Sequence, residues 1–336
     1  MKNILLPRVI FGTSALGNLY VALNDNEKLA IVKECITHSS VPVVFDSAGK
    51  YGAGLALESL GKCLKQLEVK PDDVLISNKL GWLRTKLNTP EPTFEPGVWR
   101  NLEHDAVQKI SYKGILECYE QGNSLLHGYE AQMVSVHDPD EYISQGHTPA
   151  AQDKLYNDIL DAYWALGELK QQGKVKAIGI GSKDWRIIER ITRDVDLDWV
   201  MIANSMTVYS HPAELVSFME EMERKGVAII NSAVFNAGFL IGSDYYNYKL
   251  KSRESHPDLY KWRDSFFALC NAYDVKPAEV CVAFGLMAPG VKSIALSTSN
   301  PNRVKGNIDM AWAKIPGAFW DEMKLQGLLD INYKYL

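Results

Sequence analysis

The chain has 336 residues, of which 46% are hydrophobic and 23% are charged, and its formal net charge is −5 at pH 7. This length provides enough apolar side chains for one large α/β barrel or for two domains of average size. Because the basic residues are scattered and form no run, the charge gives no reason to expect a nucleic acid or a membrane surface as a partner. The composition favours a soluble enzyme that acts on a small molecule.

Segments typical of β-strands alternate with segments typical of α-helices along almost the whole chain. The predicted strands cover residues 9–12, 43–46, 74–78, 133–137, 177–181, 200–204, 227–232 and 293–297. The predicted helices cover residues 26–37, 55–67, 107–121, 156–172, 185–192, 212–225, 258–273 and, after the last strand, 302–312. Gly122, Gly173 and Gly226 stand just after apolar helical patterns, as is common at helix C-termini.

Eight strand–helix units without a break in composition predict one α/β domain over residues 1–336, a (β/α)8 TIM barrel. The competing layout is a doubly wound sheet with a second domain, which would normally carry G-x-G-x-x-G after the first strand. Here residues 12–17 read GTSALG, and GIGS at 179–182 lacks the third glycine. The barrel is therefore the favoured fold.

Two segments that follow predicted strands are longer than ordinary turns, at about 82–105 and 235–256. In a barrel both would rise over the catalytic face, where we expect them to bind substrate or cover a cofactor. Ordered surface loops without a function are the alternative.

The cysteines and the N-terminal sequence indicate the cellular compartment in which the protein is expected. Five cysteines form no CxxC pair, lack metal-ligand spacing and leave one unpaired in any disulfide scheme. The N-terminal sequence reads as the approach to the first strand, and no apolar stretch has transmembrane length. The cytoplasm is the expected location.

Ionisable side chains follow the ends of several predicted strands: Asp46, Tyr51, Lys79 and His137. Each alone has a structural interpretation, as a turn cap, a surface aromatic, a solvated charge or a core histidine. Together they indicate more, because a buried aspartate and lysine on neighbouring strands are costly unless they pair. The lysine would then lie beside the tyrosine and lower its pKa from about 10, while the histidine would bind the reacting oxygen. This set predicts proton transfer to a carbonyl or from an alcohol.

Five stretches are similar to signatures of the aldo-keto reductase family, in the same order and over essentially the whole chain: FDSAGKYGAGLALESLGKCL, SNKLGW, VSVHDPD, GELKQQGKVKAIGIGS and STSNPNRVKGNI. The resemblance implies the (β/α)8 barrel, and it implies that Asp46, Tyr51, Lys79 and His137 are the catalytic tetrad. It also implies hydride transfer between NAD(P)(H) and a carbonyl or alcohol carbon, without a metal and without a Rossmann domain.

The same resemblance implies cofactor contacts at Gly12, Thr13, Ser182, Asn204, Ser232, Thr298, Arg303 and Asn307. Asn204 stands where many relatives have glutamine, and Asn231 replaces an aromatic residue that stacks on the nicotinamide in many members. Ser297 replaces a lysine often found in members that prefer NADP, although Arg303 remains able to bind a 2′-phosphate. Both NADP and NAD therefore remain expected cofactors.

Within the family, FDSAGKYGAGLAL and VHDPDEY resemble sugar 1-dehydrogenases of the L-fucose and D-threo-aldose type. This implies oxidation of an aldose at its anomeric carbon to a lactone, with Tyr51 as the base and Trp82 as an apolar face for the sugar ring. The alternatives are an NADPH-dependent reductase of aldehydes or ketones, a non-catalytic barrel subunit, and an aldolase that uses Lys79 as a Schiff base. The expected partner is a small sugar or aldehyde, and the sequence indicates no oligomeric state.

Overall fold

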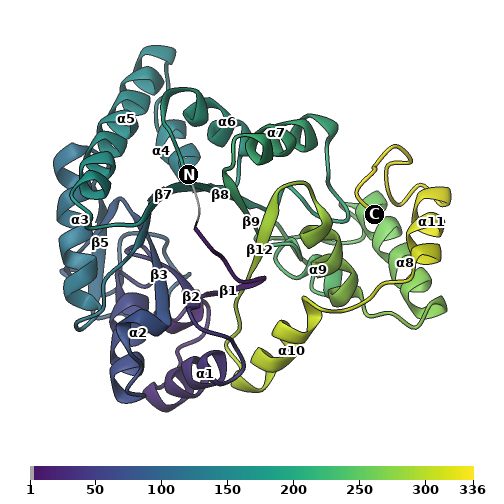
Figure 1. Ribbon diagram of the computed structural model, residues 1–336, viewed down its shortest axis with the longest axis horizontal. Helices are drawn as coiled ribbons and strands as arrows, with labels where there is room; N and C mark the ends of the chain where they lie inside the picture. Colours follow the sequence, from purple (N-terminus) through teal and green to yellow (C-terminus); the bar gives the residue numbers. More distant parts are fainter. Residues whose placement is uncertain (1–3) are drawn as a thin grey trace.

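The computed structural model describes residues 4–336. Within this range eight parallel strands form a closed barrel in the order β1-β12-β9-β8-β7-β6-β3-β2, and helices surround it (Figure 1). The barrel strands are β1 (Val9–Gly12), β2 (Val43–Ala48), β3 (Val74–Leu80), β6 (Met133–His137), β7 (Ala177–Ser182), β8 (Trp199–Ala203), β9 (Ala228–Ser232) and β12 (Val291–Leu296). The predicted (β/α)8 fold is confirmed.

Ring closure depends on pairing between the two ends of the chain. Val9 of β1 is in register with Ile294 of β12, while Phe11 is in register with Phe45 of β2. The Ser293 hydroxyl also donates a hydrogen bond to the Pro7 carbonyl at 2.5 Å. The barrel therefore has no free strand edge.

Most of the predicted helices begin and end within a few residues of the positions that the sequence patterns indicate. Their bounds are α1 (Asp25–Thr37), α2 (Leu55–Gln66), α3 (Tyr112–Leu125), α4 (Pro139–Ser144), α5 (Pro149–Gln171), α6 (Trp185–Asp194), α7 (Ala213–Arg224), α8 (Pro257–Ala272), α9 (Pro277–Met287), α10 (Val304–Met310) and α11 (Gly317–Leu325). Side-chain caps fix several starts; for example, Asn24 and Glu27 form a capping box at α1.

Several helical assignments differ from the sequence prediction, and helices α4 and α11 were not predicted at all. The helix predicted from residue 107 begins at Tyr112, after the Ser111 cap, because residues 104–108 form a strand. The helix predicted from residue 156 already begins at Pro149. Helix α9 was not predicted because it is apolar on most sides and gives no 3.6-residue pattern.

The two long segments also contain secondary structure. Strand β4 (Trp82–Lys86) pairs antiparallel with β5 (His104–Gln108), so residues 87–103 form the connection of a hairpin. Strands β10 (Tyr245–Tyr246) and β11 (Lys249–Leu250) form a second, smaller hairpin.

The barrel interior changes character along its strands because every second residue points inward. Near the strand N-termini the interior holds an apolar cluster. This cluster contains Ile10, Val44, Leu75, Met133, Ala177, Trp199, Met201, Ala228 and Ile230, and Ile4 and Leu6 pack against it. Two or four residues further along the same strands, ionisable groups take the inward positions. The catalytic mouth is therefore at the carboxyl ends of the strands.

Candidate active site

Strands β2 and β3 bring a buried carboxylate and a buried ammonium together. Lys79 Nζ donates a hydrogen bond to Asp46 Oδ2, and the Ser77 hydroxyl donates to Asp46 Oδ1 at 3.1 Å. Lys79 Nζ also donates to the Tyr51 hydroxyl at 3.3 Å. The structure thus joins three of the residues that the sequence predicted to act together.

Tight backbone packing fixes the position of Tyr51 after β2. A Cβ atom on Gly17 would lie 2.9 Å from the Tyr51 carbonyl carbon and oxygen. Gly52 has a φ of +60°, and a Cβ there would lie 2.3 Å from the Gly17 carbonyl oxygen. Because only glycine fits at both positions, the turn holds the phenol at the barrel mouth.

Burial raises the pKa of Tyr51 above its usual value, and the Lys79 ammonium opposes that shift. From the sequence we expected the cation to lower this pKa, but the desolvation of the phenol outweighs the effect of the cation. Burial also works to lower the pKa of Lys79, yet Asp46 and Tyr51 outweigh it and hold that pKa above its usual value. Lys79 is therefore a stable cation beside the phenol.

His137 ends β6 and completes the predicted set of four. Its ring lies edge-on to Tyr51, with centroids 5.6 Å apart. Burial, together with the Lys50, Lys79 and Lys183 ammonium groups, lowers the pKa of His137 well below its usual value. The imidazole is thus neutral near pH 7 and suited to donating one hydrogen bond.

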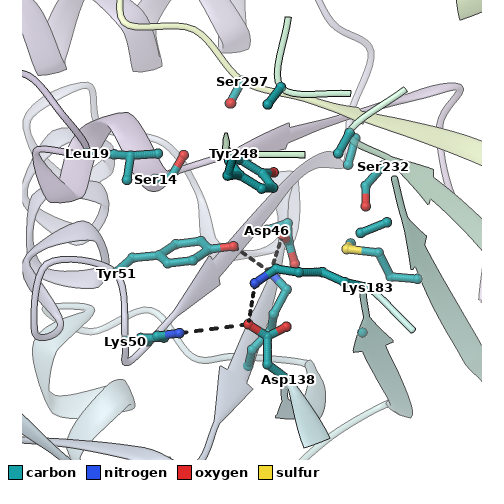
Figure 2. A pocket seen from close by; sticks show the side chains of 18 of the residues that line it. Ser14, Leu19, Asp46, Lys50, Tyr51, Asp138, Lys183, Ser232, Tyr248 and Ser297 are labelled. Atoms are coloured by element: carbon teal, nitrogen blue, oxygen red, sulfur yellow. Dashed lines mark hydrogen bonds and ion pairs between the residues drawn. The ribbon is translucent and has the colours of Figure 1, made fainter. Parts of the chain in front are cut away.

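The four side chains lie in a cavity of about 820 Å³ at the carboxyl ends of the strands. Trp99 from the β4–β5 connection and Tyr248 from the β10–β11 turn are aromatic parts of its wall. The Trp99 ring lies 5.8 Å from the Tyr51 ring, centroid to centroid. Figure 2 shows Tyr248 and Tyr51 in the same pocket. Both long segments therefore contribute residues to the cavity.

A second group of charged residues lines the same cavity beside the first. Lys50 Nζ lies 2.7 Å from Glu95 Oε1 and 3.0 Å from Glu141 Oε2. Lys183 Nζ lies 2.5 Å from Glu141 Oε1. Asp138 lies between the two lysines (Figure 2), and burial raises its pKa to about 6. We call these five residues the Lys50 network.

Sequence reasoning did not find the Lys50 network or the aromatic wall. Lys50 and Asp138 directly adjoin Tyr51 and His137 in the chain, so their proximity to predicted site residues was an available signal. Trp99 and Tyr248 stand in long connecting segments, whose paths no local pattern predicts.

The residues expected to contact the cofactor are found in two groups. Gly12, Ser182 and Ser232 line the cavity. Thr13, Asn204, Thr298, Arg303 and Asn307 do not line it. The Thr13 hydroxyl donates to the Asp46 carbonyl at 3.1 Å and so joins β1 to β2. Thr298 accepts a hydrogen bond from Asn300 N at 3.1 Å, and Arg303 is exposed before α10.

The cavity has features that fit a nicotinamide cofactor. Ser14, Ser182, Ser232 and Ser297 supply hydroxyl groups along its wall, which suit amide and phosphate groups. A Cβ on Gly12 would lie 3.2 Å from Ser297 Cβ, so glycine keeps this part of the wall open. Nearby, Asn204 Oδ1 is buried and has no hydrogen-bond partner within residues 4–336. We infer that these residues are able to hold the group.

Trp82, expected to face the substrate, does not line the cavity. Its ring packs against Phe94 at 5.8 Å and lies 5.4 Å from Lys50 Nζ. Trp99 is the tryptophan that lines it, and Trp99 Nε1 donates to Glu95 Oε2 at 2.7 Å.

The described part of the chain offers no metal site and no membrane-spanning helix. No group of three or more His, Cys, Asp or Glu side chains there is arranged to hold a metal ion. The cysteines at 35, 63, 118, 270 and 281 are free and buried. In residues 4–336, no helix has both the length and the apolar character needed to cross a membrane.

Comparison with known proteins identifies the class. The model of the aldo/keto reductase family matches residues 8–324. The chain therefore belongs to the aldo/keto reductase family, whose members are oxidoreductases that use a nicotinamide cofactor.

Curated relatives share about a quarter of their residues with this chain. A pyridoxal 4-dehydrogenase from Microbacterium luteolum is 26% identical over 330 residues, which are 95% of this chain and 93% of the relative. A D-threo-aldose 1-dehydrogenase from a Pseudomonas species is 26% identical over 327 residues, with the same coverage of 95% and 93%. An L-galactose dehydrogenase from Arabidopsis thaliana is 22% identical over 299 residues, covering 89% of this chain and 82% of the relative.

Solved structures show the same fold. The holo form of an aldo-keto reductase from Bacillus halodurans aligns with a TM-score of 0.68 at 18% identity, covering 97% of this chain and 93% of that one. A glycerol dehydrogenase from Gluconobacter oxydans aligns with a TM-score of 0.66 at 16% identity, covering 98% and 95%.

Proposed function

We propose that this chain oxidises the anomeric carbon of a neutral aldose of the L-fucose or D-threo-aldose type to a lactone, with NADP or NAD as the hydride acceptor. The relatives named for D-threo-aldose and L-galactose support the substrate class. The observation that carries the proposal is the charge balance of the cavity wall beside Tyr51.

Within residues 4–336, four carboxylates and four lysines line the cavity, namely Asp46, Glu95, Asp138 and Glu141 with Lys50, Lys79, Lys183 and Lys249. All of these lysines except the exposed Lys249 form ion pairs with carboxylates of the same wall. The wall is therefore rich in polar groups but has little uncompensated charge. Such a wall suits a neutral molecule with several hydroxyls better than an anion.

The reaction removes a hydride from the anomeric carbon and a proton from its hydroxyl. A nicotinamide cofactor, when bound, supplies the hydride acceptor. We assign Tyr51 as the base for the proton, because its phenol faces the cavity and its oxygen accepts a hydrogen bond from Lys79. Lys79 stabilises the phenolate, and Asp46 holds Lys79 in place.

His137 has a separate role in this mechanism. Because its imidazole is neutral and its ring stands against Tyr51, it can donate a hydrogen bond to the reacting oxygen without repelling Lys79. The ring of Trp99 supplies an apolar face for the sugar, the role expected of Trp82. Such a face matches the C–H side of a pyranose ring.

A substrate panel tests the proposal directly. Purified enzyme is assayed with aldoses and simple aldehydes, with each cofactor and in both directions, by nicotinamide absorbance. We expect oxidation of one aldose configuration, with a loss of about tenfold or more in kcat/KM when one ring hydroxyl is inverted. An enzyme that ignores every aldose but reduces small aldehydes efficiently would overturn the proposal in favour of an aldehyde reductase.

A further inference from the structure

Lys50 has hydrogen-bonding capacity that its ion pairs leave unused. An ammonium group has three N–H donors. Glu95 at 2.7 Å and Glu141 at 3.0 Å account for two of them. Asp138 Oδ2 lies 3.9 Å away, too far for a hydrogen bond. The Lys50 side chain is only 5% exposed and lines the cavity, so a bound molecule is the available partner for the third donor.

Asp138, in contrast, has an acceptor oxygen, Oδ2, whose neighbouring charged groups are too far away for ordinary hydrogen bonds. Its Oδ2 atom is 3.5 Å from His137 Nε2, 3.7 Å from Lys183 Nζ and 3.9 Å from Lys50 Nζ. All three distances exceed those of ordinary hydrogen bonds, although the side chain is only 15% exposed. Figure 2 shows this carboxylate between the two ammonium groups. A carboxylate that is mostly shielded from water is costly without a close donor, and a hydroxyl from a bound molecule would supply one.

The backbone holds Asp138 in a conformation that few residue types adopt. Its φ of +44° and ψ of +59° lie in the left-handed region, directly between His137 and the start of α4 at Pro139. Most side chains are strained in this region, whereas aspartate and asparagine adopt it more readily than others. The chain thus places an acceptor one residue from His137 and a donor one residue from Tyr51.

We propose that Lys50 and Asp138 recognise two neighbouring ring hydroxyls of the sugar, Lys50 donating to one and Asp138 accepting from the other. This inference rests on the proposed aldose oxidation and names the groups that select the sugar. The separation of 3.9 Å between donor and acceptor allows both contacts on adjacent carbons. Because each group adjoins a tetrad residue, the recognised hydroxyls lie beside the reacting carbon.

The test combines substrate and protein changes. The preferred aldose and its monodeoxy analogues are oxidised by the wild type, Lys50→Met and Asp138→Asn. We expect the wild type to lose about tenfold or more in kcat/KM for two analogues that lack hydroxyls on adjacent carbons. Lys50→Met should abolish the loss of kcat/KM for the analogue that lacks one of these hydroxyls. Asp138→Asn should reduce the loss for the analogue that lacks the other. Asparagine is chosen because it keeps the left-handed backbone.

Matched controls are available elsewhere on the surface. Lys276→Met changes a lysine that is 80% exposed. Asp274→Asn changes an exposed aspartate whose φ is +52°, so it repeats the same substitution in the same backbone region. Both control variants should lose as much kcat/KM for the two analogues as the wild type does. Cofactor titration and thermal unfolding show whether each variant is folded.

Lys50→Arg covers the case in which Lys50→Met fails to fold, because arginine keeps a cation between Glu95 and Glu141. Lys50→Arg should change the loss of kcat/KM for the same analogue that Lys50→Met affects. Variants that lower kcat/KM equally for the parent sugar and all analogues would overturn the inference and leave the proposed function standing. A wild-type enzyme that oxidises no aldose would overturn both.

Discussion

The same strands build two unlike ends of this barrel. Strand β3 has Leu75 in the apolar cluster and Lys79 in the mouth, four residues further on. Strand β6 likewise runs from Met133 to His137. At one end the inward side chains form an apolar cluster, while at the other they form ion pairs around a cavity. Along β3 and β6, only four residues therefore separate the side chains that stabilise the barrel from those that line the cavity.

This separation has an energetic reason. Buried charges are costly unless paired, so the mouth requires matched ions and a rigid frame. The apolar cluster, in which Trp199 is fully buried against Gly179, provides that frame without ionisable groups that would compete for the same partners. We therefore expect substitutions at the two ends to affect different measurements.

The largest expected effect is the loss of turnover in Tyr51→Phe. Only the phenolic proton is removed, and proton transfer contributes about 10²–10⁴-fold to rate. We expect kcat to fall by that range, while the unfolding midpoint and cofactor affinity stay close to wild type. Steady-state kinetics with thermal unfolding provides the measurement. A mutant that turns over at nearly the wild-type rate would show that the tyrosine is not the base.

At the apolar end, Trp199→Ala should lower stability rather than activity. Removing a fully buried tryptophan leaves a cavity and costs about 3–5 kcal/mol of unfolding free energy. Urea unfolding measures this change, and kcat per folded molecule should stay within about twofold of wild type. Trp164→Ala is the control, because that ring is 70% exposed and its loss should cost less than about 1 kcal/mol. Equal losses in both variants would contradict the comparison.

In the mouth, Lys79→Met should shift the pH dependence of oxidation. The Lys79 charge lowers the pKa of Tyr51 against the effect of burial, so its removal raises that pKa further. The base must be deprotonated to accept a proton, and the rise in kcat/KM should therefore move to higher pH by about one unit or more. The pH–rate profile of a variant shown to be folded checks this. An unchanged pH–rate profile would show that Lys79 does not set the pKa at which Tyr51 acts.

The smallest expected effect lies outside both ends, at Arg303. This exposed residue precedes α10, and a guanidinium there can contact a 2′-phosphate through two hydrogen bonds. We expect Arg303→Ala to weaken NADP by about tenfold and NAD by less, as measured by fluorescence titration. Lys305→Ala, which removes a neighbouring cation that is 61% exposed, is the control. Equal weakening of both cofactors would indicate adenine stacking instead.

The sequence predicted the barrel because its strands are short apolar runs separated by periodic helices. The alternation of strand-like and helix-like segments located all eight barrel strands to within a few residues. It also predicted that Asp46, Tyr51, Lys79 and His137 would meet, since strand ends of a barrel share one face.

The rest of the site could not be read from local patterns. Trp82 and Trp99 both stand in the segment after β3, and only the hairpin pairing of β4 with β5 decides which one reaches the cavity. The pKa of Tyr51 depends on a balance between burial and Lys79, and burial is a property of the folded chain. Helix α9 lacks a polar face, so its sequence could equally form a buried strand.

The pairing of β1 with β12 has a consequence for synthesis. Val9 is translated long before its partner Ile294, which lies far along the chain. Until then β1 and β9 would each present an unpaired strand edge, which favours association with other chains. Truncation before β12 should therefore yield an aggregating product rather than a smaller enzyme, and chaperone demand should fall sharply once residues 291–296 are translated.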